Sequence, residues 1–557
     1  MDPIEKAKKW LSPLYDEETR SKVLCMINHD PKELEDAFYK DLEFGTGGLR
    51  GVMGVGSNRM NRYTVGMTTQ GVANYVKMCF SSDLKPKVVI SYDNRHCSKE
   101  FALVTAKVFA ANGFDVFLFD NLRPTPELSF AIRELKCRCG VMMTASHNPK
   151  EYNGYKFYWE DGAQVVNPHD KRVIEEVNKI TDISMVNFGS DDDMTNIHLI
   201  GEDMDNKYLS AILTLTLSPE SVARHNDIKI VYSPLHGTGV NLVPMALNRM
   251  GLTKVYSVPD QSIVDGDFPT IASPNPEEAS ALYMAIESAK KRGADIVMAT
   301  DPDADRVGIA VKNNEGEFVL LNGNQTASIL TYYLLRRWSE LGRLNENTYM
   351  VKTIVTTELL RAIAERYGVH MYNVLTGFKY IAEVVRENEG KKVFIGGGEE
   401  SYGFNAGEFV RDKDAVLACC LIAECAMWAL DLDMTLWNLL GEIYNEFGEY
   451  KESLISITMR GKEGAEQISS IMSGYRSDPP NEINGLRVAK VIDYKESEKT
   501  GLPKSNVLQF FTEDGSVISV RPSGTEPKIK FYFGVKGADI DKKLAGLERY
   551  FRNLLSN

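Results

Sequence analysis

The chain has 557 residues, of which 43% are hydrophobic and 25% are charged, and its formal net charge at pH 7 is -13. This length predicts three or four domains with large cores, in an ordinary soluble globular protein. The negative charge argues against a nucleic-acid-binding protein, which should be basic. It leaves an anionic substrate open, because a few Arg and Lys residues can dominate a cleft.

Targeting and membrane segments are not expected. Residues 1–11 are too charged for a secretory signal and predict an amphipathic helix. The most apolar segment, residues 415–432, contains two acidic residues and is marginal in length for a bilayer, so we expect a buried helix and no membrane partner. The cysteines include no C-x-x-C pair, and the apolar surroundings of Cys419, Cys420 and Cys425 favour buried free thiols in a reducing cytoplasm.

The first part of the chain reads as an α/β domain. Asp30 and Pro31 predict an N-cap and a first helical turn. A strand at 87–92, a helix at 101–112 and a strand at 114–119 give a β-α-β alternation, which predicts a mostly parallel sheet covered by helices. A hairpin-like excursion is expected over residues 152–166. The stretch 187–206 is polar, acidic and turn-rich, so we end the first domain at residue 206.

The rest of the chain repeats this pattern twice and then changes. Strands are expected at 227–232, 254–258 and 296–299, then a helix at 325–341 and strands at 349–355 and 393–395. Strands at 452–458, 516–520 and 529–535 with helices at 462–472 and 539–555 form a smaller unit. The predicted domains are 1–206, 207–322, 323–445 and 446–557.

The stretch Gly140-Val-Met-Met-Thr-Ala-Ser-His-Asn-Pro149 is the first candidate for chemistry. Its apolar start and polar end read as a buried strand running into a surface loop, where a nucleophile would be Ser146. On an extended segment the side chains of Ser146 and His147 would point apart, so a Ser-His relay is not expected. No G-x-S-x-G elbow surrounds the serine. The plain alternative is an ordinary polar turn.

The second candidate is the sequence Asp301-Pro-Asp-Ala-Asp305-Arg306, after another expected strand. With two-residue alternation, three aspartates can face one way from an extended loop, and they repel one another unless a cation lies among them. An EF-hand is excluded, because Arg306 and Lys312 stand where it needs Gly and Glu. Three oxygen ligands suit Mg²⁺, and a serine without a base suggests a phosphoserine whose phosphate completes the metal site. A solvated acidic turn is the alternative.

Three further loops combine glycines with groups that bind phosphates or sugars. In residues 44–51, glycines would let the backbone approach a ligand, and Arg50 offers a planar fork for a phosphate. In residues 396–401, carboxylate and hydroxyl groups can hold sugar hydroxyls. In residues 521–525, main-chain N–H groups, hydroxyls and an arginine make a phosphate nest. Each of these three loops is also compatible with an ordinary turn. A further segment, residues 411–414, places a cation beside carboxylates, and its plain alternative is a surface ion-pair cluster of little energetic value.

Four of these loops occur in the order Thr144–Pro149, Asp301–Arg306, Gly398–Ser401 and Arg521–Thr525. In this order they resemble the signature loops of the α-D-phosphohexomutases, and the resemblance covers nearly the whole chain. It implies three similar α/β domains with mixed, mostly parallel sheets and a smaller α+β C-terminal domain around a central cleft. The Gly398-Glu-Glu-Ser401 loop and the chain length are similar to the bacterial-type α-phosphoglucomutases, with phosphopentomutase-like relatives close by.

The resemblance implies interconversion of α-D-glucose 1-phosphate and D-glucose 6-phosphate, through a phosphoserine and glucose 1,6-bisphosphate, which is both intermediate and activator. The implied partners are small sugar phosphates, with no nucleic acid and no membrane, for a cytoplasmic monomer or homodimer. One Mg²⁺ per subunit would be bound by Ser146, Asp301, Asp303 and Asp305. The implied catalytic residues are Ser146, His147, Lys156, Arg306 and Lys413, and the implied substrate-binding residues are Arg50, Thr376, Lys379, Glu399, Ser401, Arg521, Ser523, Gly524 and Thr525.

Two questions stay open at this point. The general base is Lys413 or Lys156, without a choice between them. The alternatives for function are a phosphopentomutase acting on ribose or deoxyribose 1-phosphate, a phosphomannomutase, a glucose 1,6-bisphosphate synthase, a metal-dependent phosphatase and a non-catalytic sugar-phosphate sensor.

Overall fold

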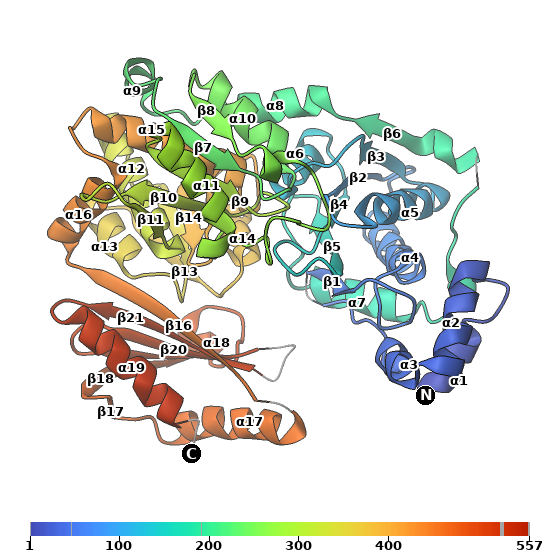
Figure 1. Ribbon diagram of the computed structural model, residues 1–557. Coiled ribbons are helices and arrows are strands. Elements are labelled where there is room, and N and C mark those ends of the chain that lie inside the picture. Colours follow the sequence, from blue (N-terminus) through green and yellow to red (C-terminus); the bar gives the residue numbers. More distant parts are fainter. Residues whose placement is uncertain (1, 46, 191, 460, 524–527, 555–557) are drawn as a thin grey trace. The chain divides into compact units, whose positions relative to one another are not determined.

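The computed structural model describes residues 2–45, 47–190, 192–459, 461–523 and 528–554 (Figure 1). It divides into two compact units. The first consists of Met1–Asn322, Ala382–Phe394 and Tyr402–Asp433, and the second of Gly323–Ile381, Ile395–Ser401 and Met434–Asn557. None of the described helices is both long and apolar enough to cross a bilayer.

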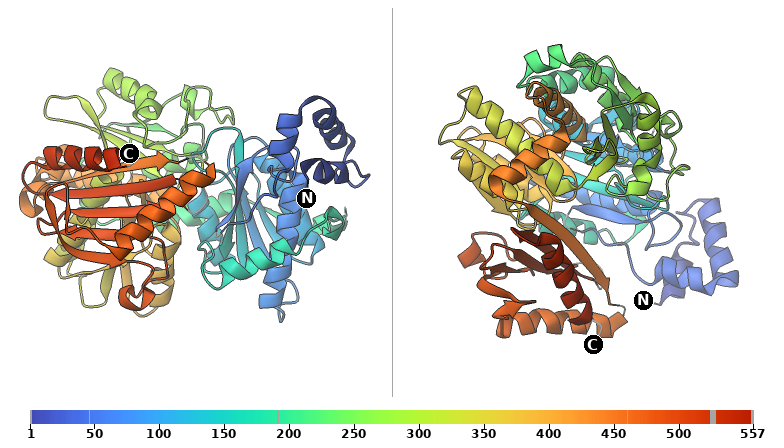
Figure 2. Two further views of the ribbon diagram at one scale, coloured as in Figure 1. Left: turned by 90° about the horizontal axis from the view of Figure 1, so that it is seen from below. Right: turned by 60° about the vertical axis from the view of Figure 1, so that its left-hand side comes forward.

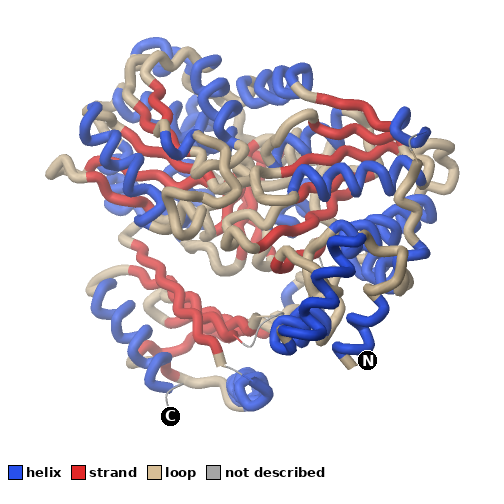
Figure 3. The backbone as a smooth tube through the Cα atoms, turned by 45° about the vertical axis from the view of Figure 1, so that its right-hand side comes forward, coloured by secondary structure: helices blue, strands red, loops and turns tan. Residues whose placement is uncertain are grey.

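The first unit opens with a six-stranded mixed sheet in the order β1-β5-β4-β2-β3-β6, with helices packed against its strands (strands red and helices blue in Figure 3). Strand β2 is parallel to β3 and β4, whereas β5 is antiparallel to β4 and β1. The elements of this region are α1 (Pro3–Lys9), α2 (Glu17–His29), α3 (Pro31–Phe38), β1 (Gly48–Val52), α4 (Arg62–Cys79), β2 (Lys87–Tyr92), α5 (Ser98–Ala111), β3 (Asp115–Phe119), α6 (Thr125–Glu134), β4 (Cys139–Met143), β5 (Tyr152–Trp159), α7 (His169–Asn178), β6 (Ile197–Ile200) and α8 (Glu202–Leu213).

Local sequence signals explain several of these elements. Asp30 caps α3 as predicted, because its Oδ1 accepts a hydrogen bond of 3.0 Å from the N–H of Glu33. The expected hairpin over 152–166 is one long strand, β5, whose return arm contributes an isolated bridge between Tyr158 and Gln164. The polar stretch before residue 206 is not a plain linker. It contains β6, which extends the sheet beside β3 although its residues are largely exposed.

The second sheet of this unit has the order β11-β10-β9-β7-β8, with β7 parallel to β8 and β9 and β10 antiparallel to β9 and β11. Helix α15 is fully buried from Ala415 to Ala429, as predicted for the most apolar segment, and its three cysteines are buried free thiols. The elements are α9 (Pro219–Arg224), β7 (Ile230–Ser233), α10 (Gly239–Arg249), β8 (Val255–Ser257), α11 (Ala279–Arg292), β9 (Ile296–Thr300), β10 (Val307–Lys312), β11 (Phe318–Leu321), β15 (Gly403–Ala406) and α15 (Ala415–Leu430).

The second unit contains a third α/β region and a sheet in the order β16-β21-β20-β19-β18-β17. Strands β12 and β13 are parallel, and neighbouring strands of the other sheet are antiparallel. Helices α17 and α19 cover one face of that sheet (Figure 2). The elements are α12 (Gly323–Glu340), β12 (Thr348–Thr353), α13 (Leu359–Arg366), β13 (His370–Val374), α14 (Phe378–Asn388), β14 (Val393–Glu399), α16 (Leu436–Phe447), β16 (Tyr450–Thr458), α17 (Gly461–Ser477), β17 (Glu482–Ile483), β18 (Leu486–Asp493), α18 (Ser497–Thr500), β19 (Leu508–Thr512), β20 (Val517–Pro522), β21 (Lys528–Lys536) and α19 (Ile540–Leu554). Of these, α14 from Ala382 onward and the start of β14 up to Phe394 are counted with the first unit. Three α/β regions with mixed sheets and a C-terminal α+β region confirm the predicted fold class.

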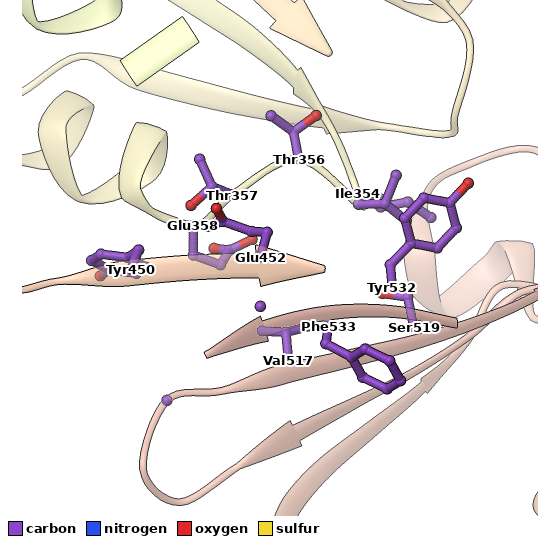
Figure 4. A pocket seen from close by; sticks show the side chains of 13 residues that line it. Ile354, Thr356, Thr357, Glu358, Tyr450, Glu452, Val517, Ser519, Tyr532 and Phe533 are labelled. Carbon is purple, nitrogen blue, oxygen red and sulfur yellow. The ribbon is translucent and has the colours of Figure 1, made fainter. Parts of the chain in front are cut away.

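A small cavity lies inside the second unit, between the turn after β12 and the strands β16, β20 and β21 (Figure 4). Its volume of about 30 Å³ is of the size that one water molecule occupies. The carboxyl group of Glu452 lies beside Thr357 at its edge. Burial raises the pKa of Glu452 to about 7, which keeps a large share of this carboxyl protonated near neutral pH.

Candidate active site

Ser146 lies in the loop that follows β4, at the carboxyl end of a strand in a parallel part of the sheet. Its φ of 52° is left-handed, and its N–H donates 2.8 Å to Thr144 Oγ1. Its Oγ donates 2.8 Å to Asp301 Oδ2 and lies 3.1 Å from His147 Nδ1. The prediction that the side chains of Ser146 and His147 point apart is therefore wrong, because the strand has already turned at Ser146 and its alternation no longer applies.

His147 is a neutral neighbour of the serine. Burial, together with the nearby guanidinium groups of Arg306 and Arg50, lowers the pKa of His147 to about 3. The imidazole is uncharged at physiological pH and can exchange a hydrogen bond with Ser146 Oγ.

Arg95 holds the loop that carries Ser146 in place, a role that the sequence analysis did not predict. Its Nη2 donates to the carbonyl oxygens of Ser146 (2.6 Å) and Asn148, and its Nη1 donates to those of Pro149 (2.8 Å) and Tyr152 (3.0 Å). The guanidinium is buried and pairs with Asp93 at 3.4 Å, so the planar fork is fixed from both sides. Its position directly after β2, which is parallel to β4, is the one feature from which it could have been found.

The three aspartates lie in the connection between β9 and β10, and all three are buried. The predicted extended loop is wrong: Ala304 has a φ of 48° and its N–H donates 2.9 Å to the carbonyl of Asp301, which makes a tight turn. Asp301 Oδ1 accepts from the N–H groups of Asp305 (3.1 Å) and Arg306 (3.0 Å). The turn brings one oxygen of each aspartate within 4.8 Å of the other two.

The free oxygens of these aspartates fit a divalent metal ion. Asp303 Oδ1 and Asp305 Oδ1 are buried, and no described residue donates a hydrogen bond to them. Burial raises the pKa of Asp301 well above its ordinary range, with further repulsion from Asp305 and Asp303. A bound cation would relieve both the repulsion and the missing partners, and hard carboxylate oxygens are what Mg²⁺ prefers.

Two lysines face the same aspartates. Lys156 Nζ lies 2.6 Å from Asp303 Oδ2 and 3.3 Å from Asp305 Oδ2, and Lys413 Nζ lies 3.3 Å from Asp305 Oδ2. Burial alone would raise the pKa of Asp303 and of Asp305, but Lys156 lowers the first and Lys413 with Lys156 lowers the second. The two carboxylates therefore stay ionised and available to a cation.

The reading of residues 411–414 as a surface ion-pair cluster is wrong. Arg411, Asp412, Lys413 and Asp414 are all buried, because the segment runs into the buried helix α15. Their charges are consequently much more strongly coupled than those of exposed pairs.

Two supports of the aspartate turn were missed. Thr125, at the start of α6, donates from its N–H to the carbonyl of Asp303 (2.9 Å) and from its Oγ1 to Asp303 Oδ2 (2.8 Å). Gly237 packs against the turn so closely that a Cβ there would lie 2.5 Å from Pro302 Cα. The N–H of Thr238 donates 2.8 Å to the carbonyl of Pro302. Their sequence signal is limited to a Thr-Pro helix start and a Gly-Thr-Gly loop, both common.

Arginines border this group of residues. Arg50 Nη1 donates 3.2 Å to Asn148 Oδ1 of the serine loop. Arg306 Nη1 pairs with Glu277 Oε1 at 3.0 Å, and its Nε lies 3.8 Å from Asp305 Oδ1. Arg50 is thus hydrogen-bonded to the loop that carries Ser146. The first unit brings together Ser146, His147, Lys156, Asp301, Asp303, Asp305, Arg306 and Lys413.

The remaining predicted residues belong to the second unit. Thr376 Oγ1 is buried without a hydrogen-bond donor or acceptor, Lys379 Nζ lies 5.2 Å over the ring of Tyr380, and Glu399 is buried at the end of β14. Ser401 follows β14, Arg521 lies in β20, and Ser523 follows β20, where its N–H donates 2.7 Å to the carbonyl of Lys528. Gly524 and Thr525 lie outside the described residues. The substrate-binding roles of this group stay predictions.

Comparison with known proteins covers most of the chain. Family models described as "Phosphoglucomutase/phosphomannomutase" match residues 41–184 (alpha/beta/alpha domain I), 206–316 (domain II), 322–447 (domain III) and 477–548 (C-terminal domain). A phosphoglucomutase of Staphylococcus epidermidis is 38% identical over 517 residues, and one of Staphylococcus aureus is 38% identical over 521; each alignment covers 91% of this chain and 92% of the relative. The structure of the phosphoglucomutase pp63/parafusin from Paramecium, in its open form, has a TM-score of 0.70 and 18% identity, covering 92% of this chain and 94% of that one. The similarity to the Paramecium structure is a similarity of fold.

Proposed function

The chain belongs to the phosphoglucomutase/phosphomannomutase family, and we propose that it interconverts α-D-glucose 1-phosphate and D-glucose 6-phosphate. The observation that carries this proposal is the contact of Ser146 Oγ with Asp301, beside two carboxylates that have free buried oxygens. A nucleophilic serine next to a cation site suits phosphoryl transfer. The choice of glucose is supported by the names of the relatives that are 38% identical.

One Mg²⁺ per subunit would be held by Asp301, Asp303 and Asp305 together with the phosphate carried on Ser146. When bound, Mg²⁺ neutralises negative charge on the phosphoryl group that is transferred. Lys156 and Lys413 add positive charge at the same place.

The reaction proceeds in two transfers. In the first, the 6-hydroxyl of glucose 1-phosphate attacks the phosphorus on Ser146. A bond from phosphorus to O6 forms and the bond to Ser146 Oγ breaks. The hydroxyl proton passes to the general base, Lys156 or Lys413, as that lysine gives its own ammonium proton to the departing Ser146 Oγ. The product, glucose 1,6-bisphosphate, turns around. In the second transfer Ser146 Oγ attacks the 1-phosphate and the bond from phosphorus to O1 breaks. The same lysine takes the serine proton and gives its own to O1, and glucose 6-phosphate is released.

The remaining residues bind and orient. Arg306 and His147 are assigned to orienting the phosphoserine, and Arg50 to a phosphate of the substrate. Glu399 and Ser401 are assigned to the sugar hydroxyls, because carboxylate and hydroxyl groups match them as acceptors and donors. Residues assigned to the distal phosphate and the rest of the substrate are Arg521, Ser523, Gly524, Thr525, Thr376 and Lys379.

The test is a rate comparison with Mg²⁺ and a trace of glucose 1,6-bisphosphate. Glucose 1-phosphate, mannose 1-phosphate and ribose 1-phosphate are compared on the wild type, on Ser146→Ala and on the control Ser210→Ala, whose serine is exposed on α8. We expect glucose 1-phosphate to be fastest by about tenfold or more, Ser146→Ala to be inactive and Ser210→Ala to equal the wild type.

Other outcomes assign other functions. A preference for ribose or mannose phosphate would keep the transfer mechanism and replace the sugar. Steady release of inorganic phosphate would indicate a phosphatase, and accumulation of glucose 1,6-bisphosphate a synthase. Binding of all three sugars without turnover would overturn the proposal in favour of a sensor.

A further inference from the structure

Outside the residues assigned above, the first unit buries a second group of carboxyl groups. Glu127 lies in the first turn of α6, Asp205 lies in α8, and Asp414 caps the N-terminus of α15. Glu127 and Asp414 are 0% exposed and Asp205 is 8% exposed. These residues, which we call the acid cluster, join three helices. Two of these helices begin beside the turn that carries Asp301, Asp303 and Asp305. Thr125, the first residue of α6, donates to Asp303, and Lys413, just before α15, pairs with Asp305.

The charges of the acid cluster do not balance if all three carboxyls are ionised. The cation that faces them is Arg123, whose Nε and Nη2 donate to the two oxygens of Asp205 at 2.6 and 3.0 Å. Its Nε is still 3.8 Å from Glu127 Oε2, which is too far for a hydrogen bond. Asp414 accepts 2.7 Å from the hydroxyl of Tyr208 and 2.9 Å from the N–H of Leu417, which are neutral donors. Among the described residues, Arg123 is thus the cation beside Glu127, and it is already paired with Asp205.

Glu127 is the member without a donor. Both of its carboxyl oxygens are buried and accept no hydrogen bond from the part of the chain that the structure describes. An ionised carboxylate in that condition costs several kcal/mol. Glu127 and Asp205 are neighbours, because the same Arg123 Nε lies 2.6 Å from Asp205 Oδ1 and 3.8 Å from Glu127 Oε2. Two carboxyl groups in such contact hold one proton between them, because two adjacent anions cannot both stay ionised.

We propose that Glu127 is a neutral carboxylic acid that donates a hydrogen bond to Asp205 and thereby fixes the start of α6, so that Thr125 holds the carboxylate of Asp303 in place. Glu127 is a positioning residue: it acts on the aspartate turn through Thr125, which contacts Asp303 with both its N–H and its hydroxyl. The part of this inference that concerns Asp303 as a metal ligand rests on the proposed function, whereas the resident proton does not.

The electrostatics of the acid cluster agree with a resident proton. Burial raises the pKa of Glu127 well above its ordinary value, and the contact with Asp205 and the charge of Asp414 raise it further, against the opposing effect of Arg123. A group whose pKa is higher in the folded chain than in the unfolded chain stabilises the fold. Its full contribution to the free energy of unfolding is present at a pH below the pKa of the unfolded chain. That contribution is lost as the pH rises through the folded pKa. Loss of this proton should therefore weaken the fold on the alkaline side.

The test compares Glu127→Gln with Glu127→Leu. The glutamine has the same shape and keeps an N–H donor for Asp205, but it has no proton to lose. We expect Glu127→Gln to keep kcat within about twofold, and its thermal midpoint to rise relative to the wild type as the pH increases from 6 to 9. Asp414, whose pKa burial raises to about 6, is present in both proteins, so the difference between them reports Glu127 and its coupling to Asp414. Glu127→Leu removes the donor and should lower kcat by about tenfold or more with little change in KM.

Infrared spectroscopy tests the proton directly and needs no catalysis. Wild type minus Glu127→Gln at pH 7 should show the C=O stretch of one protonated carboxylic acid. The control Glu134→Gln, at the exposed end of the same helix in an ion pair with Lys207, should show none. Absence of the band, a thermal-midpoint difference that does not change with pH, or failure of Glu127→Gln to fold would each overturn the proposal. If the band is present but Ser146→Ala is as active as the wild type, the proposed function fails and the resident proton stands.

Discussion

The substitution Arg95→Lys isolates the role of the guanidinium that holds the serine loop. Lysine keeps a positive charge for Asp93, but it is a point charge and cannot reach the four carbonyls that Arg95 binds with its planar fork. Hydrogen bonds from a charged donor contribute about 1.5–3 kcal/mol each, and part of this is recovered by water or by the lysine. We therefore expect a loss of about 2–4 kcal/mol in the free energy of unfolding.

The effect on catalysis should be larger than a stability effect alone. Without the fork, Ser146 Oγ is no longer fixed against Asp301, and a displacement of about 1 Å can lower kcat by about a hundredfold. The assay measures urea unfolding and kcat for Arg95→Lys and for the control Arg138→Lys. Arg138 is partly exposed and pairs with Asp83 and Glu160, so its loss should change stability by about 1 kcal/mol or less and leave kcat unchanged. Equal effects of the two substitutions would refute the assigned role of Arg95.

Three other perturbations have defined outcomes. Asp303→Asn should weaken Mg²⁺ binding by about tenfold or more in calorimetry, because it removes a charged metal ligand; unchanged affinity would remove Asp303 from the site. Gly237→Ala should lower kcat, because its Cβ would lie 2.5 Å from Pro302 Cα and displace the aspartate turn; an active variant with unchanged Mg²⁺ affinity would contradict this. The pKa of Glu452 is raised to about 7, so loss of its proton should lower the thermal midpoint of the second unit as the pH rises through 7. Glu452→Gln has no such proton and should show a smaller fall of the thermal midpoint. Identical pH profiles of the variant and the wild type would contradict this role of Glu452.

Much of the fold could be predicted from the sequence where periodicity and local caps act alone. The strand at 87–92, the cap at Asp30 and the buried helix after residue 415 follow from patterns within a few residues. Strand β6 was not predicted, because its residues are exposed or only partly buried and the segment around it is polar. It is a strand because it pairs with β3, a contact that no local pattern reports.

The candidate site was predicted in its residues but not in its geometry. The signature loops predicted Ser146 and the three aspartates, and the aspartates do converge. The expected extended conformations were wrong, because Ser146 and Ala304 adopt left-handed conformations that end the strand alternation. The burial of Asp412 and Lys413 could not be read from their charge, since it is imposed by the helix that follows. Arg95 and Thr125 act through contacts with distant segments, and no local pattern reports such contacts.

The most direct measurement is the phosphorylation state of Ser146 during turnover. The enzyme is incubated with glucose 1,6-bisphosphate, separated from it, and then mixed with glucose 1-phosphate, with phosphopeptides identified by mass spectrometry before and after mixing. The account predicts one phosphate on Ser146 that is transferred to the sugar in a single turnover at a rate no slower than kcat. A phosphate on another residue, or a phosphate on Ser146 that stays in place while the sugar turns over, would contradict it.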